Sequence, residues 1–217
     1  MDRRSTCSFL RVLALIAAAL ACSAAIAQTA PVVLVVGDSI SAGYGLASGA
    51  GWVSLLEKKL AAERYPHRVV NASISGDTTA SGRERLPALL RRYHPEVTVI
   101  ELGGNDGLRG GNLDAMRDNL DAMAAATQKA GSRVLLLGIR LPPNYGPAYV
   151  QRFAAIFSEV AKTRKAALVP FLFEGFGEDN AMFQSDRIHP GAAAQPRLLG
   201  NVWPALEPLL GAPPKQR

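Results

Sequence analysis

The chain has 217 residues, of which 48% are hydrophobic and 19% are charged. This composition excludes a largely disordered protein, and the length predicts one domain with a sizeable core. The formal net charge is +6, but the basic residues are scattered along the chain and are not gathered with aromatic residues. We therefore expect no role in nucleic-acid binding.

The first 27 residues have the pattern of a secretory signal peptide. Arginines precede the apolar run 12–21, and Ala25-Ile26-Ala27 follows as a small-residue cleavage site. The run is too short for a comfortable membrane span, so we expect no stable membrane insertion. Export to the periplasm or beyond the cell is the interpretation. Cleavage after Ala27 would remove Asp2 and three arginines, which lowers the formal charge from +6 to +4.

The two cysteines, Cys7 and Cys22, both lie in this leader, so the mature domain would have no disulfide. Cys22 leaves one alternative open, in which it becomes the lipidated first residue of a lipoprotein. Leu20 stands two residues before Cys22, whereas such signals usually place it three before, so export without a lipid is favoured.

Hydrophobic strands alternate with amphipathic helical segments in the rest of the chain. The expected strands are residues 32–37, 69–72, 97–102, 134–139 and 167–169. Apolar residues at helical spacing fall in 52–60, 86–90, 113–123 and 149–160, the third of these segments with Asn112 as its N-cap. The segment after Pro190 is helical in pattern, although we expect Pro204 and Pro208 to interrupt or kink it. Five such units predict an α/β domain, residues 28–211, with a five-stranded parallel sheet covered on both faces and a polar tail at 212–217.

Four polar clusters stand out, and three of them follow the first three strands directly. The clusters are Asp38-Ser39, Ser75-Gly76-Asp77, Gly103-Gly104-Asn105-Asp106 and Asp186-Arg187-Ile188-His189. The carboxyl ends of parallel strands meet at one edge of the sheet, where ligand chemistry occurs in such folds. We therefore expect these clusters to converge in space.

Ser39, His189 and Asp186 together offer a nucleophile, a general base and a group that orients the base. A serine after a strand is more often only a helix N-cap, and Asp186 with His189 could form only a turn. The combination favours catalysis. The other histidines, His67 and His94, each adjoin a proline in a polar turn, so we expect both to be solvated surface groups.

An acyl-transfer site also needs donors for the oxyanion that develops on the substrate. The side-chain NH₂ of Asn105 and the backbone N–H groups of Gly76 and Ser39 are the candidates. The run around Asn105 could also be a generic turn, because Asn, Asp and Gly dominate turns for conformational reasons.

These four clusters match, in order and spacing, the four motif blocks of the SGNH (GDSL) hydrolase family, and the resemblance covers residues 31–210. It implies a flavodoxin-like three-layer α/β/α sandwich. It also implies Ser39 as nucleophile, Gly76 and Asn105 as oxyanion donors, and His189 as the base paired with Asp186. The reaction would be hydrolysis of fatty acyl esters or thioesters, including lysophospholipids, by an exported enzyme through an acyl-enzyme, without a metal or organic cofactor. Nothing in the sequence demands more than a monomer, so a monomer is expected.

The resemblance further implies where a small-molecule acyl substrate would lie. The loop 107–111, with Leu108 and Arg109, would be a mobile flap that responds to acyl chains. Residues expected to contact substrate are Asp38, Leu108, Arg109, Ile139, Arg140, Leu141 and Pro142.

Two other functions remain as alternatives. The same catalytic blocks would serve a carbohydrate O-acetyl esterase, although the apolar residues near Leu108 and Leu141 favour longer acyl chains. A non-catalytic nucleotide- or phosphate-binding module is disfavoured, because the turn 37–43 fits neither common glycine-rich phosphate motif and Asp38 would repel phosphate.

Overall fold

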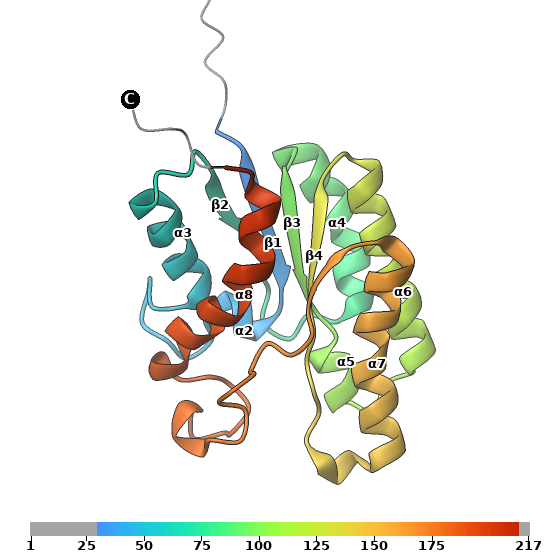
Figure 1. The fold of residues 1–217 in the computed structure, drawn as a ribbon. Helices are drawn as coiled ribbons and strands as arrows, with labels where there is room; N and C mark the ends of the chain where they lie inside the picture. Colours follow the sequence, from blue (N-terminus) through green and yellow to red (C-terminus); the bar gives the residue numbers. More distant parts are fainter. Residues whose placement is uncertain (1–29, 213–217) are drawn as a thin grey trace, which may run out of the picture. The chain divides into compact units, whose positions relative to one another are not determined.

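The computed structural model describes residues 30–212, so the predicted leader and the end of the polar tail lie outside the described residues. Five parallel strands form one sheet in the order β2-β1-β3-β4-β5, and Figure 1 shows β2, β1, β3 and β4 in that order. This is the flavodoxin-like doubly wound order, which confirms the expected fold class. The strands are β1 (Val32–Gly37), β2 (Arg68–Asn71), β3 (Val97–Glu101), β4 (Arg133–Leu137) and β5 (Ala167–Val169).

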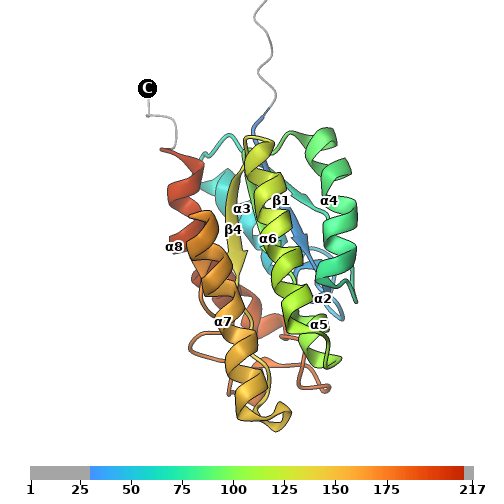
Figure 2. The same cartoon turned by 90° about the vertical axis from the view of Figure 1, so that its right-hand side faces the viewer.

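Helices cover both faces of the sheet. One face carries α3 and α8, which pack against each other, and the other carries α4, α6 and α7 (Figures 1 and 2). The helices are α2 (Ser39–Ala42), α3 (Trp52–Ala62), α4 (Thr79–Tyr93), α5 (Gly104–Leu108), α6 (Leu113–Lys129), α7 (Pro147–Arg164) and α8 (Gln195–Leu210), with the 3₁₀ turns η1 (Pro143–Tyr145), η2 (Asn180–Met182) and η3 (Ala192–Ala194). None of the helices within residues 30–212 is long and apolar enough to cross a membrane.

The largely apolar sequences of β1, β3 and β4 follow from this double covering. Every residue of β1 and β3 is buried, and so is every residue of β4 after Arg133. A strand buried on both faces has no reason to alternate apolar with polar residues. The carboxyl ends of these buried central strands carry the loops described below.

Helix α8 differs from the expectation at its prolines. It is helical from Gln195 to Leu210 without interruption, although Pro204 and Pro208 lie inside it. Each proline lacks the N–H that would bond four residues back, to the carbonyl of Gly200 and of Pro204 respectively. These residues all lie on the exposed face, where water can satisfy the carbonyls, while a buried stripe anchors the opposite face. The predicted interruption was therefore wrong.

His67 also differs from the expectation. Its side chain is only 2% exposed, and its Nε2 lies 3.2 Å from Glu96 Oε2. It sits in the loop that leads from α3 into β2 and packs near Tyr65, with ring centroids 6.2 Å apart. Burial lowers the pKa of His67. The prediction of a solvated group was wrong for His67 and is confirmed for His94, which is exposed.

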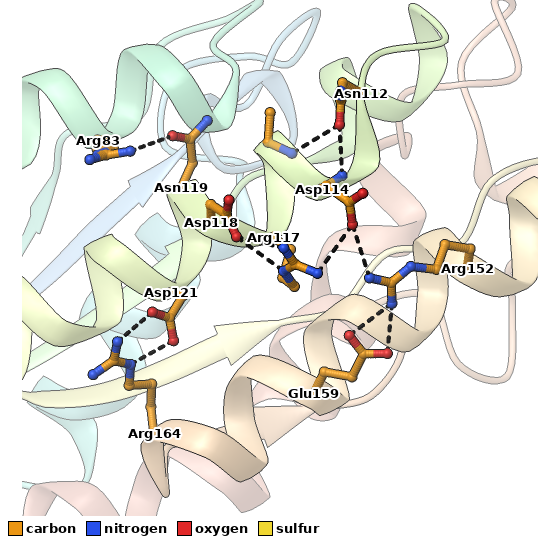
Figure 3. Close-up of polar contacts among 11 residues, drawn as sticks. Arg83, Asn112, Asp114, Arg117, Asp118, Asn119, Asp121, Arg152, Glu159 and Arg164 are labelled. Atoms are coloured by element: carbon orange, nitrogen blue, oxygen red, sulfur yellow. Dashed lines mark hydrogen bonds and ion pairs between the residues drawn. The ribbon is translucent and has the colours of Figure 1, made fainter.

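Helix α6 begins as its sequence predicts and is joined to its neighbours by polar side chains. Asn112 accepts hydrogen bonds from the N–H groups of Asp114 and Ala115 at 2.9 and 3.0 Å. Farther along, the Asp121 carboxylate accepts hydrogen bonds from Nε and Nη2 of Arg164 in α7 (Figure 3). The first contacts cap α6, and the ion pair joins α6 to α7 at the surface.

Candidate active site

The turn after β1 presents Ser39 at the carboxyl edge of the sheet. β1 ends at Gly37, Asp38 is the N-cap of α2, and Ser39 is the first residue of that helix. The Asp38 carboxylate accepts the Ile40 N–H at 3.0 Å. A Cβ at Gly37 would lie 2.8 Å from both Glu101 Oε2 and Ser41 Cβ, so only glycine fits there. The local sequence therefore folds into a tight strand-to-helix turn around the serine.

The loop before α8 holds Asp186 and His189 in one compact turn. Asp186 Oδ1 accepts the backbone N–H groups of Ile188 and His189 at 2.9 and 3.0 Å. Its Oδ2 lies 2.6 Å from His189 Nδ1. These bonds, the His189 backbone bond first, lower the pKa of Asp186 to about 2. The carboxylate thus stays charged and fixes the orientation of the imidazole.

The two segments meet although they lie far apart in sequence. His189 Nε2 is 2.9 Å from Ser39 Oγ. With a proton on Nδ1 facing Asp186, Nε2 can accept the Ser39 hydroxyl proton. The Tyr44 ring lies against the imidazole, with centroids 4.6 Å apart. The arrangement can generate a nucleophilic serine oxygen.

Asn105 lies beside this serine, but its amide already has acceptors. It belongs to α5, which follows β3, and its Nδ2 donates to Asp38 Oδ2 at 3.1 Å and to the Asp77 carbonyl at 2.9 Å. An amide nitrogen has two protons, so an oxyanion at this place would have to share or displace one of these bonds. Asn105 is thus near the serine and fixed in orientation.

Gly76 and Arg109 contact each other. The Gly76 carbonyl accepts a hydrogen bond from Arg109 Nη2 at 3.1 Å. Gly76 has a φ of 85°, which favours glycine and turns the chain after β2. Neither residue lines the cavity described next, and Asp186 lies behind His189, outside that lining.

A cavity of about 600 Å³ opens beside Ser39 and His189. Sequence-predicted residues that line it are Asp38, Ser39, Asn105, Leu108, Ile139, Arg140, Leu141, Pro142 and His189. Three aromatic side chains complete its apolar wall and were missed: Phe171, Phe173 and Phe183. Phe171 and Phe173 come just after β5, so their place at the carboxyl edge was the available signal. The cavity lining therefore combines polar groups, those of Ser39 and His189 among them, with an apolar wall.

The segment 107–111 is held from outside the cavity. The Tyr145 hydroxyl donates to the Leu108 carbonyl at 2.9 Å, and the Tyr149 hydroxyl donates to the Gly111 carbonyl at 3.0 Å. Leu108 itself is the last residue of α5. The expected flap therefore begins in a helical turn and is tied by two tyrosines to η1 and α7.

Two buried carboxyl groups lie next to the serine. Asp38 is 2% exposed and Glu101 is 0% exposed. Burial raises the pKa of Asp38 to about 6, and burial together with the charge of Asp38 raises the pKa of Glu101 well above its ordinary value. Glu101 was not singled out from the sequence, because one acid at the end of an apolar strand carries no spacing signal.

Comparison with known proteins identifies the family. The GDSL-like lipase/acylhydrolase family model matches residues 35–196. The chain is 59% identical over 186 residues to esterase TesA of Pseudomonas aeruginosa, covering 86% of this chain and 91% of that protein. The chain belongs to the GDSL-like lipase/acylhydrolase family. It is therefore an ester hydrolase, as the motif blocks implied.

Other members of the GDSL family agree with this assignment. Thioesterase 1/protease 1/lysophospholipase L1 of Escherichia coli is 41% identical, covering 85% of this chain and 87% of that protein. A crystal structure of TesA superimposes with a TM-score of 0.80 at 58% identity, covering 82% of this chain and 99% of that one. The esterase EstA of Pseudoalteromonas sp., in a structure inhibited by monoethylphosphonate, gives 0.79 at 38% identity, with 83% and 99% covered.

Proposed function

We propose that this GDSL-family hydrolase cleaves acyl esters and thioesters through an acyl-enzyme on Ser39. The observation that carries the proposal is the line of contacts from Ser39 Oγ to His189 Nε2, 2.9 Å, and from His189 Nδ1 to Asp186 Oδ2, 2.6 Å. His189 takes the Ser39 proton as the oxygen attacks the acyl carbon, then returns it to the leaving alcohol or thiol. Water activated by His189 then releases the acid and frees Ser39.

The oxyanion formed in each step needs hydrogen-bond donors. We propose the backbone N–H groups of Ser39 and Gly76 together with Asn105 Nδ2. The hydrogen bonds from Asn105 Nδ2 to Asp38 Oδ2 and to the Asp77 carbonyl support this role, because they fix the orientation of the amide before the substrate binds. The oxyanion would then share a proton of Nδ2 with one of these acceptors.

The cavity wall supports a proposal for the substrate class. Leu141, Phe171 and Phe173 offer apolar surface to a fatty acyl chain that extends from the serine. Fatty acyl esters and thioesters, lysophospholipids among them, fit such a wall better than an acetylated sugar does. The Escherichia coli relative is named for thioester and lysophospholipid substrates, which supports the same class.

The cellular setting is a further part of the proposal. Residues 1–27 would direct export and be removed, leaving residues 28–211 as the hydrolase domain and 212–217 as a short tail. All of the residues proposed for catalysis lie in one chain, and we propose that the protein acts as a monomer. Mass spectrometry of the protein secreted to the periplasm would locate the cleavage site, and an intact leader would contradict this part.

A series of nitrophenyl esters with growing acyl chains tests the substrate class. Each CH₂ buried on the apolar wall stabilises the bound acyl chain by about 0.8 kcal/mol, so kcat/KM should rise about four-fold per added carbon until the cavity is filled. The matched control is Ser39→Ala, which should lose activity by several orders of magnitude on every ester. A steep fall in rate beyond the two-carbon ester would favour the carbohydrate O-acetyl esterase.

A further inference from the structure

Glu101 is a fully buried acid whose contacts lie on both sides of Ser39. It is the last residue of β3 and is paired in register with Gly37 of β1. Its Oε2 accepts the hydroxyl of Ser41 at 2.8 Å and the backbone N–H of Asp38 at 3.3 Å. Asp38 and Ser41 flank Ser39, so one carboxyl oxygen bonds to the turn before and after the serine.

The neighbouring sequence leaves room for this carboxyl group and extends its contacts. A side chain at Gly37 would fill the space where Glu101 Oε2 lies, since a Cβ there would come within 2.8 Å of that oxygen. Ser41 is held from its other side as well, because its carbonyl accepts the Asn71 side-chain N–H at 2.8 Å. Glu101, Ser41 and Asn71 therefore join the turn to the ends of β3 and β2.

We propose that Glu101 is a positioning residue, which holds the turn carrying Ser39 in place for its reaction by accepting hydrogen bonds from Ser41 and Asp38. This inference rests on the proposed role of Ser39 as the nucleophile. A shift of about 1 Å in an attacking oxygen is enough to cost a large part of the rate. The contacts of Glu101 restrain that oxygen through its own helix turn.

The surroundings of Glu101 favour its uncharged form. Both donors to its Oε2 are uncharged, and its Oε1 is buried without a hydrogen-bond partner among the described residues. Burial and the nearby Asp38 carboxylate both favour the protonated form. An ionised carboxylate in such a place would be strongly destabilised. An amide of the same shape should therefore replace it, whereas an apolar side chain should not.

The charged groups around Glu101 determine how the pH profile of kcat/KM should respond when its carboxyl group is removed. Asp38 faces it from the turn, and His189 lies beyond Asp38. Arg85 of α4 donates to the Gly37 carbonyl at 3.4 Å and pairs with Asp77 at 2.7 Å. If Glu101 is uncharged, removing its carboxyl group leaves the charge near His189 unchanged. The acidic limb of the kcat/KM profile should then keep its midpoint.

The test compares Glu101→Gln, Glu101→Leu and Ser41→Ala by kcat, KM, pH profile and the rate of Ser39 labelling with a fluorophosphonate. We expect Glu101→Gln to stay within about three-fold of the wild-type kcat with the same acidic limb. Glu101→Leu leaves the Ser41 hydroxyl and the Asp38 N–H without an acceptor. We expect it to lower kcat and the labelling rate about 10- to 100-fold, with KM within about three-fold.

Thr98→Val is the matched control for a loss of stability. Thr98 lies on the same strand, is fully buried and shares a 2.8 Å hydrogen bond with Ser132, away from Ser39. It should lower the midpoint of thermal unfolding while kcat stays at the wild-type value. If Glu101→Leu does not fold, Ser41→Ala decides, because it removes one donor and keeps the acid; we expect it to lower kcat about 10-fold.

Three results would overturn the inference. The first is a wild-type kcat and labelling rate in Glu101→Leu or, where that variant does not fold, in Ser41→Ala. The second is a loss of kcat in Thr98→Val that equals the loss in Glu101→Leu. The third is a shift in the midpoint of the acidic limb of the kcat/KM profile in Glu101→Gln. Ser39→Ala separates this failure from that of the proposed function. If Ser39→Ala still hydrolyses esters, the nucleophile is misassigned, whereas an inactive Ser39→Ala beside an unaffected Glu101→Leu removes only the role of Glu101.

Discussion

Asp38 shows how a single residue at this site opposes the stability of the fold. Its carboxylate caps α2 and holds Asn105, but burial raises its pKa from 3.8 to about 6. A carboxyl group whose pKa is higher in the folded than in the unfolded chain favours folding while it is protonated. Its favourable contribution is complete below about pH 4 and is lost as the pH rises through about 6.

Asp38→Asn should therefore gain stability relative to the wild type as the pH rises. Asparagine keeps the N-cap acceptor and removes the buried charge. We expect the difference in unfolding free energy between variant and wild type to increase between about pH 4 and pH 7, by on the order of 2 kcal/mol. Urea unfolding at several pH values measures it. Asp179→Asn, at the exposed N-cap of η2, is the control, and an equal pH dependence there would contradict the explanation.

At the scale of single residues, the sequence predicts those site residues whose types and spacing match a known catalytic arrangement. Ser39, Asn105, Asp186 and His189 fall in motif blocks, and the structure brings all four to one edge of the sheet. Their catalytic roles stay predictions until they are measured. Glu101 could not be found in this way, because its importance comes from the register of β3 against β1, which no local pattern encodes.

At the scale of elements, we expect the surface ion pair between helices α6 and α7 to contribute little to stability. Asp121 of α6 and Arg164 of α7 form a two-pronged pair, with both side chains about one-third exposed (Figure 3). The Arg164 guanidinium, by hydrogen bonding and charge, lowers the pKa of Asp121. Solvent screens pairs of this kind, so their net contribution stays small even when their geometry is good.

A double-mutant cycle on Asp121→Ala and Arg164→Ala should give a coupling free energy of at most about 1 kcal/mol. We expect it to shrink further in about 1 M salt, where charges are screened within a few ångströms. Thermal or urea unfolding of the four proteins measures it. A coupling free energy of several kcal/mol that does not change with salt concentration would mean that the pair is effectively buried.

The hydrophobic pattern of the sequence predicts which strands and helices exist, but it does not predict the residues at which they end. All five expected strands are present, but β3 ends at Glu101 and β4 at Leu137, short of the expected 102 and 139. Beyond β4, Ile139 is apolar because it lines the cavity, whereas Leu102, beyond β3, is buried in the hydrophobic core. The continuity of α8 was missed for a related reason, since exposure of its prolines depends on packing against α3.

At the scale of the whole described domain, the parallel sheet explains why distant segments cooperate. Strand order β2-β1-β3-β4-β5 places the loops after β1, β2, β3 and β5 at one edge. The aromatic residues Phe171 and Phe173 after β5 stand in no polar cluster, so the spacing of polar residues could not point to them. In an enzyme for acyl chains, apolar residues at the carboxyl edge carry as much information as polar ones do.

The most direct test of this account is to trap the acyl-enzyme and locate it. Rapid acid quenching during turnover of a slow nitrophenyl ester, followed by peptide mass spectrometry, should find the acyl group on the hydroxyl of Ser39, and Ser39→Ala should carry none. An acyl group on another residue, or steady turnover in Ser39→Ala, would contradict the account.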